Sequence, residues 1–202
     1  MWDLWLERAK PIMPVMVIED VAHAIPLAQA LVAGGVRLLE VTLRTQAGLD
    51  AIKLIRHAVP EAIVGAGTVT NAMQFEQALA KGAQFVVSPG SSTELFEAAG
   101  AWGGAYLPGV ATASEVMQAR ERGFRYQKLF PAMAIGGESV LSAFSGPFAD
   151  VHFCPTGGID AHNYRQWLTH RNVFAVGGSW LTPAEQLQRH QWSTIQAMAI
   201  SC

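Results

Sequence analysis

The sequence predicts an α/β protein, a single (β/α)8 TIM barrel that spans residues 1–202. Eight short runs rich in β-branched and aromatic residues recur along the chain, and longer segments with apolar residues at helical spacing separate them. Alternation of this kind produces parallel sheets with right-handed crossovers. Eight rounds in 202 residues fit a small barrel. An open doubly wound sheet is the alternative, but no G-x-G-x-x-G motif follows the first expected strand.

The expected elements follow one another without a linker, a low-complexity segment or a domain boundary. Helical spacing is clear in several segments, and glycine follows some of them, as it often follows a helix. A single long helix on the outside is expected for residues 183–199. The expected strands cover residues 14–18, 37–43, 62–67, 84–89, 105–109, 125–130, 150–156 and 172–178, and clear helical segments cover 21–35, 46–60, 71–83 and 112–124.

Composition and charge exclude several classes of partner. Half of the residues are hydrophobic, 15% are charged and the net charge is −2, without a basic run. Neither nucleic acid nor a membrane surface is therefore expected as a partner. Asp3, Glu7 and Arg8 interrupt the apolar residues near the start, unlike the core of a signal peptide. A cytoplasmic protein is expected. The cysteines and histidines show no metal-binding spacing, so no metal is expected.

Polar residues stand at the carboxyl ends of several expected strands. Residues of a barrel strand point alternately toward the helices and toward the interior. In 37–43 the odd-numbered apolar residues suit the helix side, so Glu40 and Arg44 should point inward. Lys128 and Thr156 stand at the ends of later strands in the same way. Because active sites of this fold lie at the carboxyl ends of the strands, these four are candidate site residues.

Lys128 is the only one of four lysines on an expected strand. Its parity groups it with Phe124, Tyr126 and Phe130, which predicts an aromatic pocket inside the barrel. One interpretation is structural: Lys128 and Glu40 form a buried ion pair, or the lysine extends to the rim. The other is catalytic, because apolar surroundings favour a free amine that can attack a ketone and form a Schiff base. An inward carboxylate would then act as the general base.

Two pairs of glycines follow the last two expected strands, in PTGGI (155–159) and VGGSW (176–180). Glycine lets backbone N–H groups approach an anion, and a helix that starts there adds its dipole. The loops after strands 7 and 8 are the usual phosphate site of this barrel, so phosphate binding is predicted there. In GAGTV (65–69), Thr68 is either a ligand or a turn residue.

Seven segments together resemble the 2-keto-3-deoxy-6-phosphogluconate (KDPG) aldolases, including bifunctional members that also cleave 4-hydroxy-2-oxoglutarate (KHG). The resemblance implies a barrel, a homotrimer and a class I aldolase, in which a covalent imine replaces any metal or other cofactor. It also implies that the substrate is a small 2-keto acid phosphate. In chain order, the segments are LLEVTLRT (38–45), EAIVGAGTV (61–69), VSPG (87–90), LPGVATASE (107–115), KLFPA (128–132), FCPTGGI (153–159) and VGGSWL (176–181).

Matched by motif, the resemblance implies that Lys128 forms the Schiff base and that Glu40 is the general acid/base. Two departures bear on the substrate range: Met133 stands where the family often has an acidic residue, and GAWGGAY (100–106) is unusually rich in glycine. The implied binding residues are Arg44 and Thr68 for the carboxylate of the pyruvyl half, Pro89 and Phe130 for the pocket walls, Thr156 beside the substrate, and Gly157, Gly158 and Ser179 for the terminal phosphate.

The resulting hypothesis is the cleavage of KDPG to pyruvate and glyceraldehyde 3-phosphate. The same mechanism on the 6-phosphogalactonate epimer or on KHG is the nearest alternative, because the sequence does not reveal the stereochemical preference at C4. A barrel that only binds or isomerises phosphosugars is a different alternative, and it would not need Lys128. A purely structural protein is disfavoured, because polar residues inside a barrel oppose packing unless they are used or paired.

Overall fold

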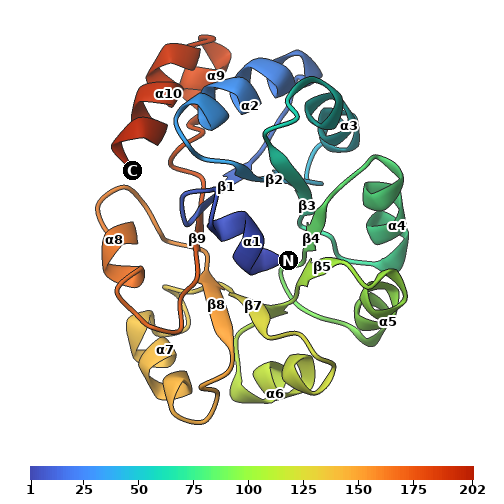
Figure 1. The fold of residues 1–202 in the computed structure, drawn as a ribbon, viewed down its shortest axis with the longest axis vertical. Coiled ribbons are helices and arrows are strands. Elements are labelled where there is room, and N and C mark those ends of the chain that lie inside the picture. Colours follow the sequence, from blue (N-terminus) through green and yellow to red (C-terminus); the bar gives the residue numbers. More distant parts are fainter.

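The computed structural model describes all 202 residues and consists of parallel strands surrounded by helices (Figure 1). This arrangement confirms the predicted α/β class. No helix combines the length and the apolarity needed to cross a membrane. The strands are β1 (Ile12–Met16), β2 (Leu38–Thr42), β3 (Ile63–Gly67), β4 (Phe85–Val87), β5 (Ala105–Leu107), β6 (Gly109–Val110), β7 (Tyr126–Leu129), β8 (His152–Pro155) and β9 (Val176–Gly178). The helices are α1 (Trp2–Leu6), the 3₁₀ turn η1 (Val21–His23), α2 (Ala24–Ala33), α3 (Gly48–Ala58), α4 (Ala72–Ala80), α5 (Thr93–Trp102), α6 (Ala113–Glu121), α7 (Glu138–Ser145), α8 (Tyr164–Trp167), α9 (Ala184–Gln188) and α10 (Trp192–Ser201).

The strands pair in parallel and form two sheets. Six strands join in the order β5-β4-β3-β2-β1-β9, and three join in the order β6-β7-β8. At one junction between the sheets, β5 and β6 follow each other with only Pro108 between them. At the other junction, isolated parallel bridges pair Phe153 with Val173 and Thr156 with Gly177. The strand predicted for 172–178 is therefore only partly formed, with β9 at its end.

The strand residues alternate between two apolar cores. Leu39 and Val41 belong to the outer core, which contains residues of both strands and helices, whereas Leu38 belongs to a separate inner core formed mainly by strand residues. The alternation predicted for 37–43 is thus confirmed. Because successive strand residues point to opposite faces, Glu40 shares the inner side with Leu38.

Strand β7 follows the same alternation, but the prediction for Phe124, which precedes the strand, needs a correction. Gln127 faces the helices, where its Nε2 donates to the carbonyl oxygens of Phe124 and Val116 at 2.9 and 3.3 Å. These bonds allow a polar side chain to be buried on that face. Phe124 precedes the strand and stacks on Phe96 in the outer core, with ring centroids 5.6 Å apart. The prediction that Phe124 shares an inner aromatic pocket with Lys128 is therefore wrong.

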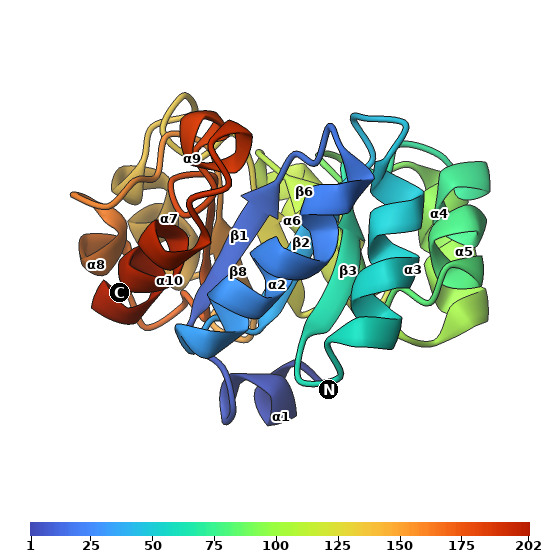
Figure 2. The same cartoon turned by 90° about the horizontal axis from the view of Figure 1, so that it is seen from above.

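Helix α1 lies across the amino-terminal end of the strands (Figure 2). Its Trp2 is 5% exposed and joins the inner core, where its ring centroid lies 5.5 Å from that of Phe85. Asp3 accepts a hydrogen bond from the hydroxyl of Tyr126. Burial and this bond raise the pKa of Tyr126 to about 12. With α1 at this end, the candidate site residues lie at the opposite, carboxyl end of the strands.

The carboxyl-terminal segment differs from the single helix predicted for 183–199. Helix α9 ends at Gln188 and α10 begins at Trp192, and between them His190 adopts a left-handed conformation with φ 53°. A residue in this region cannot continue a right-handed helix. Helix α10 then packs along α2, so closely that a Cβ on Gly34 would overlap Ala199.

Candidate active site

The candidate active site centres on Lys128 of β7 and Glu40 of β2. The Nζ atom of Lys128 donates to Oε1 of Glu40 at 3.3 Å, and the two side chains are only 5% and 1% exposed. Nζ also lies 5.3 Å from the ring centroid of Phe130. The inward alternation of both strands therefore brings together two residues that are 88 positions apart in the sequence.

The contact within this pair is long for a buried ion pair. A buried ion pair loses several kcal/mol of hydration per ion, which its attraction offsets only when the contact is short and the remaining donors are also satisfied. The 3.3 Å separation exceeds the roughly 2.7–2.9 Å that is usual for a charged N–H···O bond. Nζ of Lys128 makes no second hydrogen bond within the protein, so the rest of its donor capacity is left unsatisfied.

Glu40 has room for its side chain because residue 67 is glycine. A Cβ on Gly67 would overlap Oε1, Cγ and Cδ of Glu40. The next residue, Thr68, has a φ of 57°, which is a strained value for a β-branched side chain. Its Oγ1 accepts a hydrogen bond from Nε of Arg44 at 3.2 Å. The segment after β3 thus both accommodates the carboxylate and supports the arginine.

Cys154 of β8 is paired in register with Lys128 and belongs to the inner core. It is 1% exposed. Burial raises the pKa of its thiol to about 12, with opposing contributions from the charges of Lys128 and Glu40. The thiol therefore stays neutral beside the amine and acts as a small apolar neighbour.

A hollow of about 240 Å³ opens at the carboxyl ends of the strands. Six of the ten residues predicted for the site line it, and they come from segments after β2, β7, β8 and β9. The turn after β7 is joined to the turn after β8, because the amides of Ala132 and Met133 donate to the carbonyl oxygens of Thr156 and Gly157 at 2.8 and 3.1 Å. The six predicted residues are Arg44, Phe130, Thr156, Gly157, Gly158 and Ser179.

Two backbone amides beside this hollow have no carbonyl partner in the protein. They are the N–H groups of Gly158 and Ser179, whereas the N–H of Gly157 faces the carbonyl of Gly177 in the isolated bridge between Thr156 and Gly177. Gly157 and Gly158 both have positive φ angles, 99° and 80°, which turn the chain sharply at this point. Unpaired amide donors next to one another are a usual way of holding a phosphate or carboxylate group.

Thr68 and Pro89 are the two predicted site residues that neither line the hollow nor belong to the Glu40–Lys128 pair; Thr68 is joined to the hollow through Arg44, whereas Pro89 lies apart. It lines a separate depression with Gly90 and Ser91. Its backbone lies against Gly109, where a Cβ would overlap the Pro89 carbonyl group, and Gly109 is paired in register with Lys128. Pro89 therefore packs beside the neighbouring strand of the lysine rather than in the hollow.

Sequence reasoning missed the apolar wall of the hollow. Val15, Val17 and Ile159 line it together with the predicted polar residues. Val15 is paired in register with Glu40, so β1 places this wall next to the carboxylate strand. Strand β1 is apolar throughout, so nothing in the sequence distinguished these valines from core residues.

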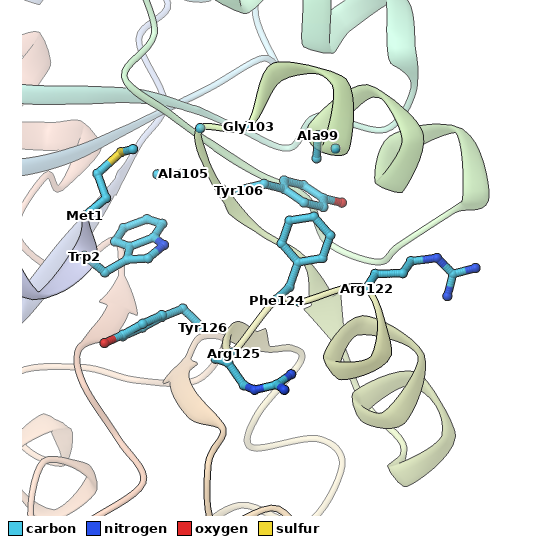
Figure 3. Close-up of a pocket in the computed structure, with 13 residues that line it drawn as sticks. Met1, Trp2, Ala99, Gly103, Ala105, Tyr106, Arg122, Phe124, Arg125 and Tyr126 are labelled. Carbon is cyan, nitrogen blue, oxygen red and sulfur yellow. The ribbon is translucent and has the colours of Figure 1, made fainter.

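A second hollow, of about 370 Å³, lies at the amino-terminal end of the strands, beside α1 (Figure 3). Its walls are rings of Trp2, Phe124 and Tyr126. The glycine-rich segment 100–106 forms another side, since Gly103 ends α5 with φ 67°. None of the predicted site residues lines this hollow.

The structure also contains no group of three or more His, Cys, Asp or Glu side chains arranged to hold a metal.

Comparison with known proteins identifies the family. Residues 5–198 match the family model described as KDPG and KHG aldolase. The chain is 50% identical over 189 residues to the 2-dehydro-3-deoxy-phosphogluconate aldolase of Pseudoalteromonas atlantica, covering 94% of this chain and 88% of the relative. It is 49% identical over 189 residues to the KHG/KDPG aldolase of Escherichia coli K12, covering 94% and 89%.

A solved structure agrees with this match over nearly the full length of both chains. It is the KDPG aldolase of Legionella pneumophila with pyruvate captured as a covalent carbinolamine intermediate. The two folds superpose with a TM-score of 0.94 at 44% sequence identity, covering 97% of this chain and 95% of the other. The chain therefore belongs to the KDPG and KHG aldolase family.

Proposed function

We propose that this chain is a class I aldolase that cleaves KDPG to pyruvate and glyceraldehyde 3-phosphate. The observation that carries the proposal is the buried contact between Nζ of Lys128 and Oε1 of Glu40, at 3.3 Å. This contact holds an amine that can act as a nucleophile within hydrogen-bonding distance of a carboxylate that can accept its proton. Family membership and the carbinolamine captured in the Legionella relative support the same chemistry.

Imine formation begins with a proton transfer from Lys128 to Glu40, which leaves the amine free to attack. Nζ adds to C2 of the keto acid, and the carbonyl oxygen, once protonated, leaves as water. The product is a protonated imine between Nζ and C2. Its positive charge withdraws electrons from C3, so the covalent bond converts a ketone into an electron sink.

Carbon–carbon cleavage then needs a base at the C4 hydroxyl. The Glu40 carboxylate accepts that proton, directly or through a water. The electrons of the O–H bond form the aldehyde carbonyl, the C3–C4 bond breaks, and its electron pair moves into the imine to give an enamine. A proton returned to C3 regenerates the imine, and water then releases pyruvate and the free amine.

Substrate orientation is assigned to the residues around the hollow. Arg44, held by Thr68, is the partner for the carboxylate of the pyruvyl half, since a guanidinium can bind both of its oxygens. Gly157, Gly158 and Ser179 are the proposed partners for the terminal phosphate, with the unpaired amides of Gly158 and Ser179 as donors. Phe130 and Thr156 also line the hollow and are the proposed contacts for the rest of the substrate. Pro89 has only a supporting role in this proposal, because it packs against Gly109 of β6, the strand that pairs with β7 beside Lys128.

KHG is the second candidate substrate. The Escherichia coli relative is named for both substrates, and this chain is 49% identical to it. KHG lacks the phosphate, so it would bind through the imine on Lys128 and through the residues that hold the pyruvyl carboxylate. The 6-phosphogalactonate epimer of KDPG differs only at C4, and comparing the two epimers directly would establish the stereochemical preference.

We also infer that the two sheets act as one closed eight-stranded barrel in a single domain over residues 1–202. The direct succession of β5 and β6 supports this closure on one side, and the bridges at Phe153 and Thr156 support it on the other. A homotrimer and a cytoplasmic location remain predictions from the sequence. Light scattering of the purified chain would test the trimer.

Reductive trapping tests the proposed chemistry. The chain is incubated with pyruvate, reduced with borohydride, digested and mapped by mass spectrometry. We expect a pyruvyl adduct on Lys128, none in Lys128→Arg, and an unchanged adduct in Lys53→Arg, which alters an exposed lysine of α3. A folded wild-type chain that gives no adduct would instead support a phosphosugar-binding barrel without imine chemistry.

A further inference from the structure

A pair of histidines meets on the surface, away from the Glu40–Lys128 pair. His23 ends η1 at the start of α2, and His190 lies in the turn between α9 and α10. Their Nε2 atoms are 3.0 Å apart, although 167 positions separate them in the sequence. The spacing of the histidines therefore could not reveal the pair, and only the packing of the last helices against α2 brings it together (Figure 1).

The two rings are held in place by Trp192. The ring of His190 stacks on Trp192 with centroids 5.7 Å apart and planes 10° from parallel. The ring of His23 meets the same indole edge-on, at 5.6 Å and 63°. The backbone beneath is also fixed, because His190 occupies the left-handed region and α10 is in close contact with α2 at Gly34. The ligand atoms are thus positioned before any ion binds, which lowers the cost of ordering them.

The separation of the two nitrogens suits a metal ion. With metal–nitrogen bonds of about 2.0–2.1 Å, two nitrogens 3.0 Å apart subtend an angle of about 95° at the ion. This angle is close to that of the square-planar or tetragonal geometries of Cu²⁺ and Ni²⁺, and imidazole is a good ligand for both. The ring centroids are 4.9 Å apart, so the Nε2 edges already face each other.

We propose that His23 and His190 form a surface site for a divalent transition-metal ion, with Cu²⁺ bound more tightly than Ni²⁺ or Zn²⁺. A hydrogen bond now joins the two Nε2 atoms; when the ion binds, the donor ring gives up its Nε2 proton and takes one from water at Nδ1, so that both rings bind as neutral imidazoles through Nε2. No further Asp, Glu, His or Cys completes a cluster, so solvent supplies the other ligands. The neighbouring cation, Arg189, is engaged by Glu185 at 3.3 Å, which reduces its repulsion of the ion.

The bound ion would join two segments that flank the hollow. One follows β1, which supplies Val15, and the other follows β9 and Ser179. Because the ion binds the folded chain through residues far apart in sequence, it should also raise the melting temperature. The site takes no part in the imine chemistry, so its test is independent of the aldolase proposal.

The experiment uses the untagged full-length chain in a non-coordinating buffer, titrated with Cu²⁺, Ni²⁺ and Zn²⁺ in parallel. Calorimetry gives stoichiometry and affinity, and quenching of tryptophan emission gives a second signal because Trp192 stacks on His190. The variants are His23→Gln and His190→Asn, chosen because asparagine tolerates the left-handed conformation. His57→Ala, at an exposed histidine of α3, is the control.

We expect one Cu²⁺ per chain in the wild type, at least tenfold weaker binding in each single variant, and no change in His57→Ala. Trp192→Phe should lose most of the quenching while calorimetry still detects the ion. Equal affinity in the wild type and in a His23→Gln/His190→Asn double variant would overturn the proposal, as would a wild type that binds none of the three ions. In either case, the contact between the rings is a structural hydrogen bond only.

Discussion

Replacing Glu40 by glutamine separates the two functions assigned to the buried pair. Glutamine has nearly the same volume, so it fits the space left by Gly67, and its Oε1 can still accept a hydrogen bond from Lys128 at the observed 3.3 Å. It cannot accept a proton. We therefore expect imine formation to persist in part while the proton-transfer steps slow by roughly 10²–10⁴-fold. Such a loss corresponds to about 2.7–5.4 kcal/mol in the activation barrier.

Stability should fall together with activity. Removing the charge of Glu40 leaves the ammonium of Lys128 without its only hydrogen-bonding anion, and both side chains are almost fully buried. Losing one partner of a buried ion pair costs about 3–5 kcal/mol. The assays are pyruvate release from KDPG, coupled to lactate dehydrogenase, borohydride trapping with pyruvate, and urea unfolding.

Glu76→Gln, at an exposed site on α4, is the matched control and should change none of the three measurements. Turnover of Glu40→Gln within about threefold of the wild type would remove Glu40 from the role of proton acceptor. Loss of turnover together with complete loss of trapping would instead mean that no other group, water included, can take the proton of the Lys128 amine in place of Glu40.

Four further predictions concern Ser179, Gly67 and the two cysteines. Ser179→Ala should raise KM for KDPG about tenfold or more and leave pyruvate trapping unchanged, because it removes a hydroxyl from the phosphate end only; equal effects on both would place the phosphate elsewhere. Gly67→Ala should lower the free energy of unfolding by about 1–3 kcal/mol, measured in urea, because its methyl group would displace Glu40. Iodoacetamide at pH 8–9 should label Cys202 but not Cys154 in the native chain, because burial keeps the Cys154 thiol protonated up to about pH 12. The raised pKa of Cys154 also means that stability should fall as pH rises from its ordinary value of 9.0 toward 12, and Cys154→Ala should reduce this fall.

Features with a strict local period could be predicted from the sequence. The alternation along 37–43 directed Glu40 inward because one face of β2 packs against helices and the other against the inner core. The same alternation, applied to residues 125–130, directed Lys128 inward near the carboxyl end of its strand. The two glycine-rich turns follow β8 and β9 and line one hollow, and phosphate binding there stays a prediction.

Features that depend on tertiary packing could not be predicted. Phe124 has the parity of an inner residue, but β7 begins only at Tyr126, so the parity does not extend to it. The break between α9 and α10 rests on the left-handed backbone of His190, which is not a residue that usually signals a stop. Trp2 joins the inner core through a five-residue helix that is too short to show a periodic pattern.

The unpaired amides of Gly158 and Ser179 beside the hollow belong to the main chain, so only a substitution to proline removes one of them. Point mutations can change the volume and charge of the hollow, but its supply of donors depends on the length and course of the turns after β8 and β9. Evolution of this chain toward longer, shorter or uncharged substrates should therefore proceed by insertion and deletion in these turns. Libraries that vary loop length should be more productive there than saturation mutagenesis.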